Sequence, residues 1–236
     1  MSVPTALERM AAGGMAGASA LVLAMDIDPG IENQFNAWYT HEHLHDRVGL
    51  PGFLRGTRWM RPDGAPAHRQ KYLTIYEAAS SSAFTSVDYL TSLNNPTPWT
   101  QRMVPAFQNS MRTVAEILGS AGTVIGREMS IVEFRADDQA QLLTWFTDVA
   151  VPEALSQPDC CGIHLLAPDP ASTMAKATTS EGKSVEDELS QLMLILHGTQ
   201  GTEDMLHRVA AGRPAGLRTE PAGEIATYTF YCTLIG

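Results

Sequence analysis

The sequence predicts an α+β protein made of two tandem ferredoxin-like units. Two observations lead to this fold class. The expected element order, β-α-β-β-α-β, occurs twice along the 236 residues, and this order defines a ferredoxin-like unit. A single fixed offset along the chain also aligns four identical pairs, which are Gln34/Gln141, Trp38/Trp145, Thr40/Thr147 and Pro51/Pro158. Two sheets in one chain can cover each other's apolar faces, so we expect the units to pack as an intramolecular pair.

The first unit is expected over residues 20–118, after a loose extension at residues 1–19 that glycines interrupt. Short apolar runs bounded by turn residues predict its strands, and apolar spacings of three and four predict its helices. In chain order these are strand Ala20–Ile27, helix Ile31–Val48, strands Phe53–Met60 and Gln70–Glu77, helix Ser81–Leu93 with its serine cap, a short helix at Trp99–Phe107, and strand Ser110–Leu118.

The second unit is expected over residues 123–236, after a flexible joint at residues 119–122 that contains two glycines. Its predicted elements are strand Val124–Phe134, helix Gln139–Val149, strands Gly162–Ala167 and Gln191–His197, helix Thr202–Ala211 and strand Glu224–Leu234. Between the two middle strands, residues 173–188 are polar and contain few apolar side chains. We expect that segment to be a disordered loop.

Composition restricts the partners. The chain is 44% apolar and 18% charged, as globular proteins are, and carries 16 basic against 26 acidic residues, a formal charge of −10. This acidic balance argues against nucleic acid and membrane partners, which need a basic surface. Three cysteines, two of them adjacent, give no disulfide framework, and no apolar run approaches the ~20 residues of a membrane span. We expect a cytoplasmic protein with a small-molecule substrate.

The first helix carries the candidate chemistry. On a regular helical wheel, Glu42 and Asp46 fall on the same side as the apolar stripe, and His43 falls on its border. A carboxylate on a buried face is costly unless it is paired or protonated. An acid beside a histidine in such a place is a candidate general acid–base site. The alternative is structural, with Asp46 paired to a neighbouring arginine and Glu42 at a frayed helix end.

Two other features of this helix have competing explanations. His41 and His45 are one turn apart and could bind a metal together, but no third ligand is evident, so we expect a solvated edge and no metal. Ala37, Leu44 and Val48 form a second apolar stripe on the wheel, which the Trp99–Phe107 segment or another subunit must cover. A homodimer of the fused chains is therefore one option.

The run Asn36-Ala-Trp-Tyr-Thr-His-Glu-His43, then Arg47 and Pro51-Gly-Phe53, resembles the first helix and second strand of EthD-like proteins of the dimeric α+β barrel superfamily. The resemblance covers about residues 20–118, and Tyr72–Glu77 is consistent with it as the strand before the second helix. It implies the fold more strongly than the chemistry, because the superfamily holds cofactor-free monooxygenases, isomerases, dehydratases and haem-binding enzymes. Most members have one unit per chain, whereas this chain has two.

The sequence therefore favours an enzyme without cofactor, of lyase, isomerase or dehydratase type, acting on a small apolar or aromatic oxygenated substrate. His43 is the expected proton carrier, with Glu42 or Asp46 as its partner. The expected substrate-binding residues are Trp38, Tyr39, Arg47, Arg55 and Trp59. The alternatives are a cofactor-free monooxygenase, a non-catalytic binding protein and a haem enzyme. Because His43 and Arg47 align with Ala150 and Ala154, we expect one active site, in the first unit.

Overall fold

The computed structural model describes residues 14–65, 69–179, 191–214, 216–218 and 224–236 and shows a mixed α+β fold. The described residues form two compact units. The first unit contains residues 16–116, 168–179 and 231–236, and the second contains residues 14–15, 117–167, 191–214, 216–218 and 224–230. The predicted domain boundaries at residues 118 and 123 stay a prediction. Within the described residues, no helix is both long and apolar enough to cross a membrane.

The sheet of the first unit has the strand order β4-β1-β3-β2-β9. Its strands are β1 (Ser19–Ile27), β2 (Phe53–Met60), β3 (Tyr72–Ala78) and parts of β4 (Phe107–Gly122) and β9 (Ala226–Ile235). The central strand β1 is antiparallel to both neighbours, with Leu21 opposite Tyr76 on β3 and opposite Val114 on β4. The predicted bounds of β2 agree with the structure, and β4 is longer than predicted at both ends.

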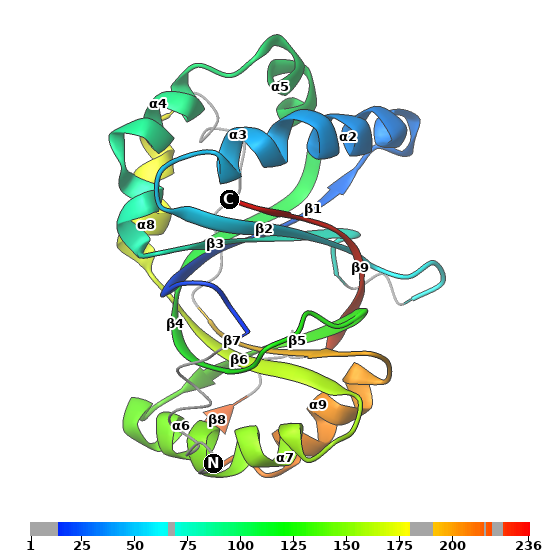
Figure 1. Cartoon of the computed structure of the whole chain (residues 1–236), viewed down its shortest axis with the longest axis vertical. Helices are drawn as coiled ribbons and strands as arrows, with labels where there is room; N and C mark the ends of the chain where they lie inside the picture. Colours follow the sequence, from blue (N-terminus) through cyan, green and yellow to red (C-terminus); the bar gives the residue numbers. More distant parts are fainter. Residues whose placement is uncertain (1–13, 66–68, 180–190, 215, 219–223) are drawn as a thin grey trace, which may run out of the picture. The chain divides into compact units, whose positions relative to one another are not determined.

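Helices cover one face of this sheet (Figure 1). They are η1 (Pro29–Ile31), α2 (Glu32–Trp38), η2 (Tyr39–His43), α3 (Leu44–Val48), η3 (Ser81–Thr85), α4 (Val87–Asn94), α5 (Pro98–Met103), η4 (Val104–Ala106), α8 (Pro170–Met174) and η6 (Ala175–Thr178). The predicted helix from Ser81 begins instead as a 3₁₀ turn. Its α-helical part starts after Ser86, whose hydroxyl accepts a hydrogen bond from the Tyr89 amide.

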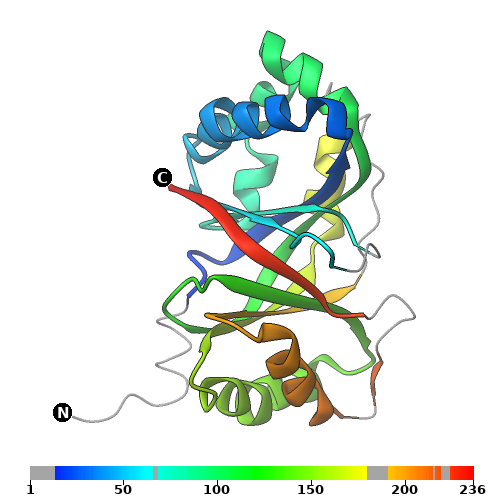
Figure 2. The same ribbon diagram turned by 90° about the vertical axis from the view of Figure 1, so that its right-hand side faces the viewer.

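The second unit has the strand order β4-β6-β7-β5-β9, with the short β8 beside β5, and helices on one face (Figure 2). Its elements are β5 (Glu128–Ala136), α6 (Gln139–Trp145), η5 (Phe146–Ala150), α7 (Val151–Leu155), β6 (Cys160–Pro168), β7 (Leu192–Gly198), α9 (Thr202–Ala211) and β8 (Leu217–Arg218). Both units thus follow the predicted element order, and the bounds of α9 agree with the prediction.

The first helix of each unit contains the same irregularity. One π-helical turn interrupts each helix, at Tyr39–His43 in the first unit and at Phe146–Ala150 in the second. The offset that aligns Trp38 with Trp145 also places the first of these turns on the second. A π-turn adds a residue to a helical turn and turns the following side chains back around the axis by roughly 100°. The sequence repeat therefore includes a shared backbone feature.

Two predicted loops are ordered elements. Residues 119–122 belong to strand β4, and a Cβ at Gly119 would lie 2.4 Å from the Phe146 ring, so glycine makes room for that ring. Of the predicted disordered segment, residues 173–178 lie in α8 and η6, packed on the first unit, because buried Thr173 bonds to the backbone of Val114. Residues 180–188 lie outside the described residues, as do residues 1–13 of the predicted extension.

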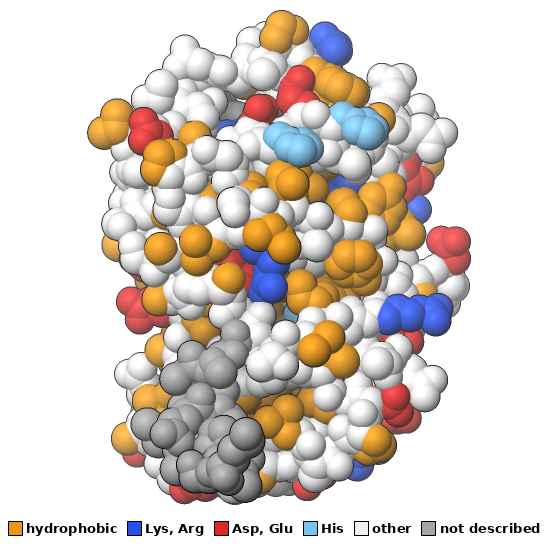
Figure 3. All heavy atoms as spheres, viewed as in Figure 1, with side chains coloured by type: hydrophobic (Ala, Val, Ile, Leu, Met, Phe, Trp, Pro, Cys, Tyr) orange, Lys and Arg blue, Asp and Glu red, His pale blue; other side chains and the backbone are white. Residues whose placement is uncertain are grey.

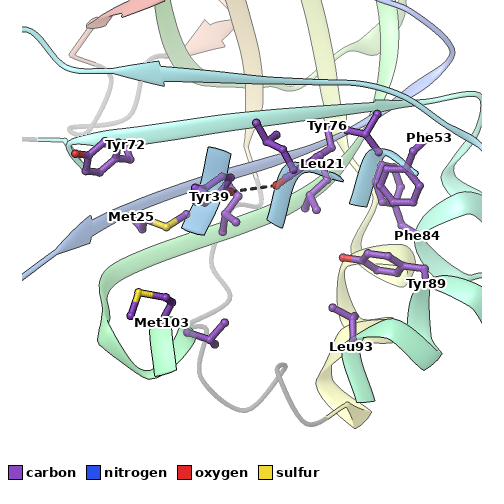
Figure 4. Close-up of a cluster of buried hydrophobic side chains, with 14 of the residues drawn as sticks. Leu21, Met25, Tyr39, Phe53, Tyr72, Tyr76, Phe84, Tyr89, Leu93 and Met103 are labelled. Atoms are coloured by element: carbon purple, nitrogen blue, oxygen red, sulfur yellow. Dashed lines mark hydrogen bonds between the residues drawn. The ribbon is translucent and has the colours of Figure 1, made fainter. Parts of the chain in front are cut away.

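The core of the first unit lies between its helices and its sheet, and is rich in aromatic side chains. Figure 4 shows part of it, with the Tyr76 hydroxyl bonded to that of Tyr39. Leu44 and Val48 belong to this core and pack where a Cβ at Gly56 would stand. The second apolar stripe is therefore covered within the unit, mainly by β2, and the predicted homodimer stays a prediction.

Candidate active site

A small cavity of about 30 Å³ lies in the first unit beside the first helix. Its lining combines an apolar surface with a cluster of basic side chains, and consists of Leu21, Leu23, His43, Arg47, Phe53, Tyr76, Tyr89, Leu93, Val104, Phe107, Arg112 and Lys176. These residues come from β1, the first helix, β2, β3, α4, η4, β4 and η6. The free space corresponds to one or two water molecules. Among the residues that the structure describes, no aspartate or glutamate lines the cavity.

His43 is the buried histidine of this cavity. Its ring is 5% exposed and packs against three aromatic rings, with centroid distances of 4.3 Å to Trp38, 4.9 Å to Tyr39 and 6.5 Å to Tyr76. Its Nδ1 atom is buried without a hydrogen-bond partner among the described residues. Burial first, and then the positive charges of Arg47, Lys176 and Arg58, hold the pKa of His43 well below its usual range. His43 is therefore neutral at pH 7.

The π-turn explains why the helical wheel misplaced the acids. The extra residue moves the buried stripe one position along the chain, from Glu42 and Asp46 to His43 and Arg47. Asp46 is exposed, which corrects the prediction of a buried carboxylate. The pKa of Asp46 is nevertheless raised, mainly by partial burial of its carboxylate. Neither acid lines the cavity, and neither bonds to His43 among the described contacts.

Glu42 instead anchors the first helix to α5. Its Oε1 accepts hydrogen bonds from the Trp38 indole at 3.2 Å, from the Thr100 hydroxyl at 3.3 Å and from Thr97. Thr97 also caps α5 by accepting from the Thr100 amide. This arrangement is the structural alternative for Glu42, although at a well-ordered part of the helix rather than a frayed end.

Trp38 and Tyr39 lie behind the cavity and are fully buried. Tyr39 stacks under the guanidinium of Arg58, whose Cζ is 4.1 Å from the ring centroid. Burial raises the pKa of Tyr39, so its hydroxyl is neutral. Tyr39 contacts the cavity through the Tyr76 hydroxyl, which donates to it at 3.3 Å. Tyr76 thus links the cavity lining to Tyr39, and the sequence did not single it out.

Arg47, one of the expected substrate-binding residues, lines the cavity. It is 5% exposed, its Nη1 donates to the Ser92 hydroxyl at 2.7 Å, and its guanidinium lies 5.9 Å from the centroid of the Tyr89 ring. Two further cations, Arg112 and Lys176, line the same cavity and were not predicted. Arg112 lies on the predicted strand Ser110–Leu118, and Lys176 lies in the segment that was predicted to be a disordered loop. The signal available in the sequence was the buried strand position of Arg112.

Arg55 and Trp59 lie on the other face of β2. Gly56 faces the helices, so by the two-residue period of a strand its neighbour Arg55 faces away, as Trp59 does. Arg55 forms a two-point ion pair with Glu77, with distances of 2.8 and 2.7 Å. The structure therefore separates these two predicted binding residues from the cavity.

The described residues of this site offer no set of metal ligands and little space for a haem. His41 and His45 are exposed, and histidine side chains are visible on the surface above the first helix (Figure 3). Among the described residues, no three histidine, cysteine or acidic side chains are placed to hold a metal. The space of about 30 Å³ beside His43 is far below the several hundred Å³ that ligand pockets provide, so a haem does not fit there.

Burial raises the pKa of Cys160 to about 11 and also raises the pKa values of Cys161 and Cys232, which disfavours thiolate chemistry.

The second unit contains a buried histidine pair, His164 and His197, with ring centroids 5.0 Å apart. Ser120 bonds to His164 Nδ1 at 2.8 Å, so this histidine has a structural contact. His68 lies outside the described residues.

Comparison with solved structures identifies the fold. An anthrone oxidase-like protein matches with a TM-score of 0.54 and 12% identity over 94% of this chain and 95% of its own. A proposed monooxygenase from Fusobacterium nucleatum subsp. nucleatum matches with a TM-score of 0.51 and 9% identity, covering 94% and 96%. A proposed chlorite dismutase matches with a TM-score of 0.52 and 9% identity, covering 92% and 96%.

These neighbours belong to the dimeric α+β barrel superfamily, and the comparison shows that this chain shares their fold. Membership of the superfamily stays a prediction. No family model matches the sequence. No curated protein matches it either. The closer resemblance to EthD-like proteins stays a prediction.

Proposed function

We propose that this chain is an enzyme that removes a proton from a small apolar or aromatic oxygenated substrate, with His43 as the base and without a metal or organic cofactor. The observation that carries the proposal is the neutral, buried imidazole of His43 at the wall of a mostly apolar cavity. A base must be deprotonated to accept a proton, and the lowered pKa of His43 keeps it so at neutral pH.

The remaining lining supports the same chemistry. Removing a proton next to a carbonyl leaves negative charge on the substrate oxygen, and a cation or hydroxyl stabilises that charge. Arg47 and Tyr76 line the cavity together with His43. The apolar side chains exclude water and hold a ring or alkyl group. Isomerisation and dehydration can each begin with this step. In retro-aldol cleavage the base instead takes the proton of the β-hydroxyl group, and the carbonyl oxygen gains the negative charge as the C–C bond breaks. We therefore propose a lyase, isomerase or dehydratase.

Oxygenation is the second candidate. The solved structures that support it are an anthrone oxidase-like protein and proposed monooxygenases with the same fold. A carbanion formed at His43 can return a proton, expel a group or react with oxygen, and the three outcomes share the first step. Consumption of oxygen separates the monooxygenase from the leading proposal.

The cavity requires adjustment before it accepts a ring. A space of about 30 Å³ holds water but not an aromatic molecule, so substrate binding must displace neighbouring side chains.

We also infer that the two units are tandem ferredoxin-like repeats whose sheets form an intramolecular barrel. The shared element order and the π-turns at matching positions of the two first helices support this.

The test is deuterium exchange at acidic C–H positions. Anthrone, benzoylacetone and 2-tetralone are incubated with the protein in D₂O without oxygen, and exchange is followed by NMR. The wild-type chain should accelerate exchange in at least one of them. His43→Gln should reduce that acceleration by ~10²–10⁴-fold, the usual contribution of a general base. His41→Gln, at an exposed position of the same helix, is the matched control and should retain it.

Repeating the reaction in air distinguishes the candidates. Oxygen uptake that depends on His43 would favour the monooxygenase, and product formation without uptake would favour a lyase or isomerase. Equal loss in the His41, His43 and His45 variants would point to a metal instead. Saturable binding of these ketones without exchange or product would identify a non-catalytic binding protein and overturn the proposal.

A further inference from the structure

We infer that Glu42 and Trp38 are positioning residues for His43, in which the carboxyl group of Glu42 holds the indole of Trp38 and the indole holds the imidazole. The inference rests on the proposed function for the reaction itself, and adds the residues that orient its base. It gives Glu42 a part in the site although Glu42 does not line the cavity.

The indole of Trp38 stacks on the ring of His43. The two ring centroids are 4.3 Å apart with 31° between the planes, whereas Tyr39 meets the same imidazole nearly edge-on, at 4.9 Å and 75°. Trp38 is fully buried and His43 is 5% exposed, so close packing leaves neither ring room to swing out. The indole face therefore determines the plane in which the imidazole lies.

The π-turn brings these two rings together. The Leu44 amide donates to the Tyr39 carbonyl oxygen, a hydrogen bond that spans five residues instead of four. The turn is therefore wider than a regular one, and His43, five residues after Trp38, comes to lie over the indole. Glu42, four residues after Trp38, lies instead at the N–H edge of the same ring.

Hydrogen bonds fix this N–H edge of the indole. Trp38 Nε1 donates to Glu42 Oε1 and to the Thr100 hydroxyl, each at 3.2 Å. The Thr100 hydroxyl in turn donates to Glu42 Oε1 at 3.3 Å, and Thr97 donates to the same oxygen. Thr100 is buried, and hydrogen bonds away from water are electrostatically strong. Together these bonds hold the indole plane against rotation.

The second unit shows that this kind of helix does not require the acid. Its tryptophan at the matching position, Trp145, also precedes a π-turn, and Val149 and Ala150 occupy the positions of the acid and the histidine. The Trp145 Nε1 atom is buried and, among the described residues, has no hydrogen-bond partner. A tryptophan before a π-turn thus packs without an acid, and the unit that lacks the histidine also lacks the acid. This supports a role of Glu42 toward His43 rather than toward the helix.

Orientation matters because a base must lie within hydrogen-bond reach of the proton that it removes, and small misplacements are costly. A loosened indole would leave His43 in the cavity without a fixed direction. The other lining side chains would still contact the substrate. The expected signature is therefore a lower kcat with little change in KM.

The test applies substitutions at Glu42 and Trp38 to the deuterium-exchange assay. Glu42→Leu removes the acceptor and should lower kcat about 10- to 100-fold, with KM within about twofold. Glu42→Gln keeps an acceptor oxygen and should retain kcat within about threefold. Trp38→Phe keeps a ring without an N–H, and Glu42→Leu should cause no further loss in that background, because the acid acts only through the indole. Asp88→Leu, at an exposed acid of α4, is the control and should keep the wild-type rate.

NMR spectroscopy distinguishes this inference from the proposed function. The ring current of Trp38 shifts the His43 ring protons, which are assigned by comparison with His43→Gln. These resonances should move or broaden in Glu42→Leu and stay in place in Glu42→Gln. The comparison needs no turnover, so it still decides the positioning role if the wild-type chain shows no His43-dependent exchange and the proposed function fails.

Three results would overturn the inference. They are unchanged His43 resonances in Glu42→Leu, an equal loss of kcat in Glu42→Gln and Glu42→Leu, and a full effect of Glu42→Leu in the Trp38→Phe background. Circular dichroism checks that each variant is folded. Thr100→Val, which removes the other acceptor of the indole N–H, replaces Glu42→Leu if that variant does not fold.

Discussion

The imidazole of His43 lies against the indole of Trp38, with ring centroids 4.3 Å apart and an angle of 31° between the rings. The same indole donates from Nε1 to Glu42, so Trp38 separates the histidine from the nearest acid of its helix. The predicted histidine–acid pair is thereby replaced by a histidine in an aromatic and cationic setting. This setting favours the neutral base over the charged imidazolium.

The depressed pKa of His43 predicts a pH-dependent stability. Below about pH 6.5 the unfolded chain takes up a proton on this histidine while the folded chain does not, so unfolding becomes easier as the pH falls. The contribution is about 1.4 kcal/mol per pH unit until the folded pKa is reached. Denaturant unfolding at pH 5, 6, 7 and 8 should therefore give a flatter profile for His43→Leu than for the wild type.

His41→Leu is the control for this measurement, because His41 is exposed on the same helix. Its profile should run parallel to that of the wild type. Parallel profiles for the wild type and His43→Leu would instead mean that His43 titrates normally in the folded protein.

The close contact between Gly119 and Phe146 predicts that Gly119 cannot be replaced by a residue with a side chain without loss of stability. A Cβ at Gly119 would lie 2.4 Å from Phe146 Cε1, and relief requires the buried ring to move. Gly119→Ala should lower the free energy of unfolding by about 1–3 kcal/mol. In the background of Phe146→Leu the same substitution should cost less. A flexible joint would show no cost in either background.

The ion pair between Arg55 and Glu77 predicts a structural role for Arg55. Glu77 is buried, and removing its charge leaves the Arg55 guanidinium without its two-point partner. Glu77→Gln should lower the free energy of unfolding by about 2 kcal/mol, less than for a fully buried pair because Arg55 is 17% exposed. Arg55→Met should affect stability and leave the rate of His43-dependent deuterium exchange within twofold. A large change in that rate without a change in stability would support the predicted binding role.

The sequence predicts the fold further than it predicts the site. Periodicity and turn residues locate nearly every strand and helix, because burial patterns repeat along the chain. The helical-wheel analysis of the first helix assumed 3.6 residues per turn throughout. The π-turn at Tyr39–His43 adds one residue, so the buried face of the helix after this turn is shifted by one position along the sequence. This moved Arg47 inward as Asp46 moved outward. Composition alone cannot detect such a turn.

Lys176 was missed for a different reason. Its segment is polar and follows a strand of the second unit, and nothing local indicates that it packs on the first. Its position depends on contacts between Thr173 and β4 that are distant in sequence. Arg112 was missed because the sequence predicted only a strand at Ser110–Leu118 and gave no sign of which of its side chains face the cavity. Long-range packing of this kind is decided by tertiary structure and leaves little trace in local patterns.

The last prediction concerns the number of sites. At the offset that aligns Trp38 with Trp145, Ala150 and Ala154 occupy the positions of His43 and Arg47, and both alanines are fully buried in the second unit. The helix of that unit thus keeps the π-turn and the packing while lacking the base and the cation. One chain should therefore bind one molecule of any ketone whose exchange depends on His43, measured by calorimetry. Ala150→His should destabilise the fold by about 1–3 kcal/mol through overpacking and create no second site. Two equivalent sites per chain, or exchange that survives His43→Gln and disappears in Ala150→His, would contradict this assignment.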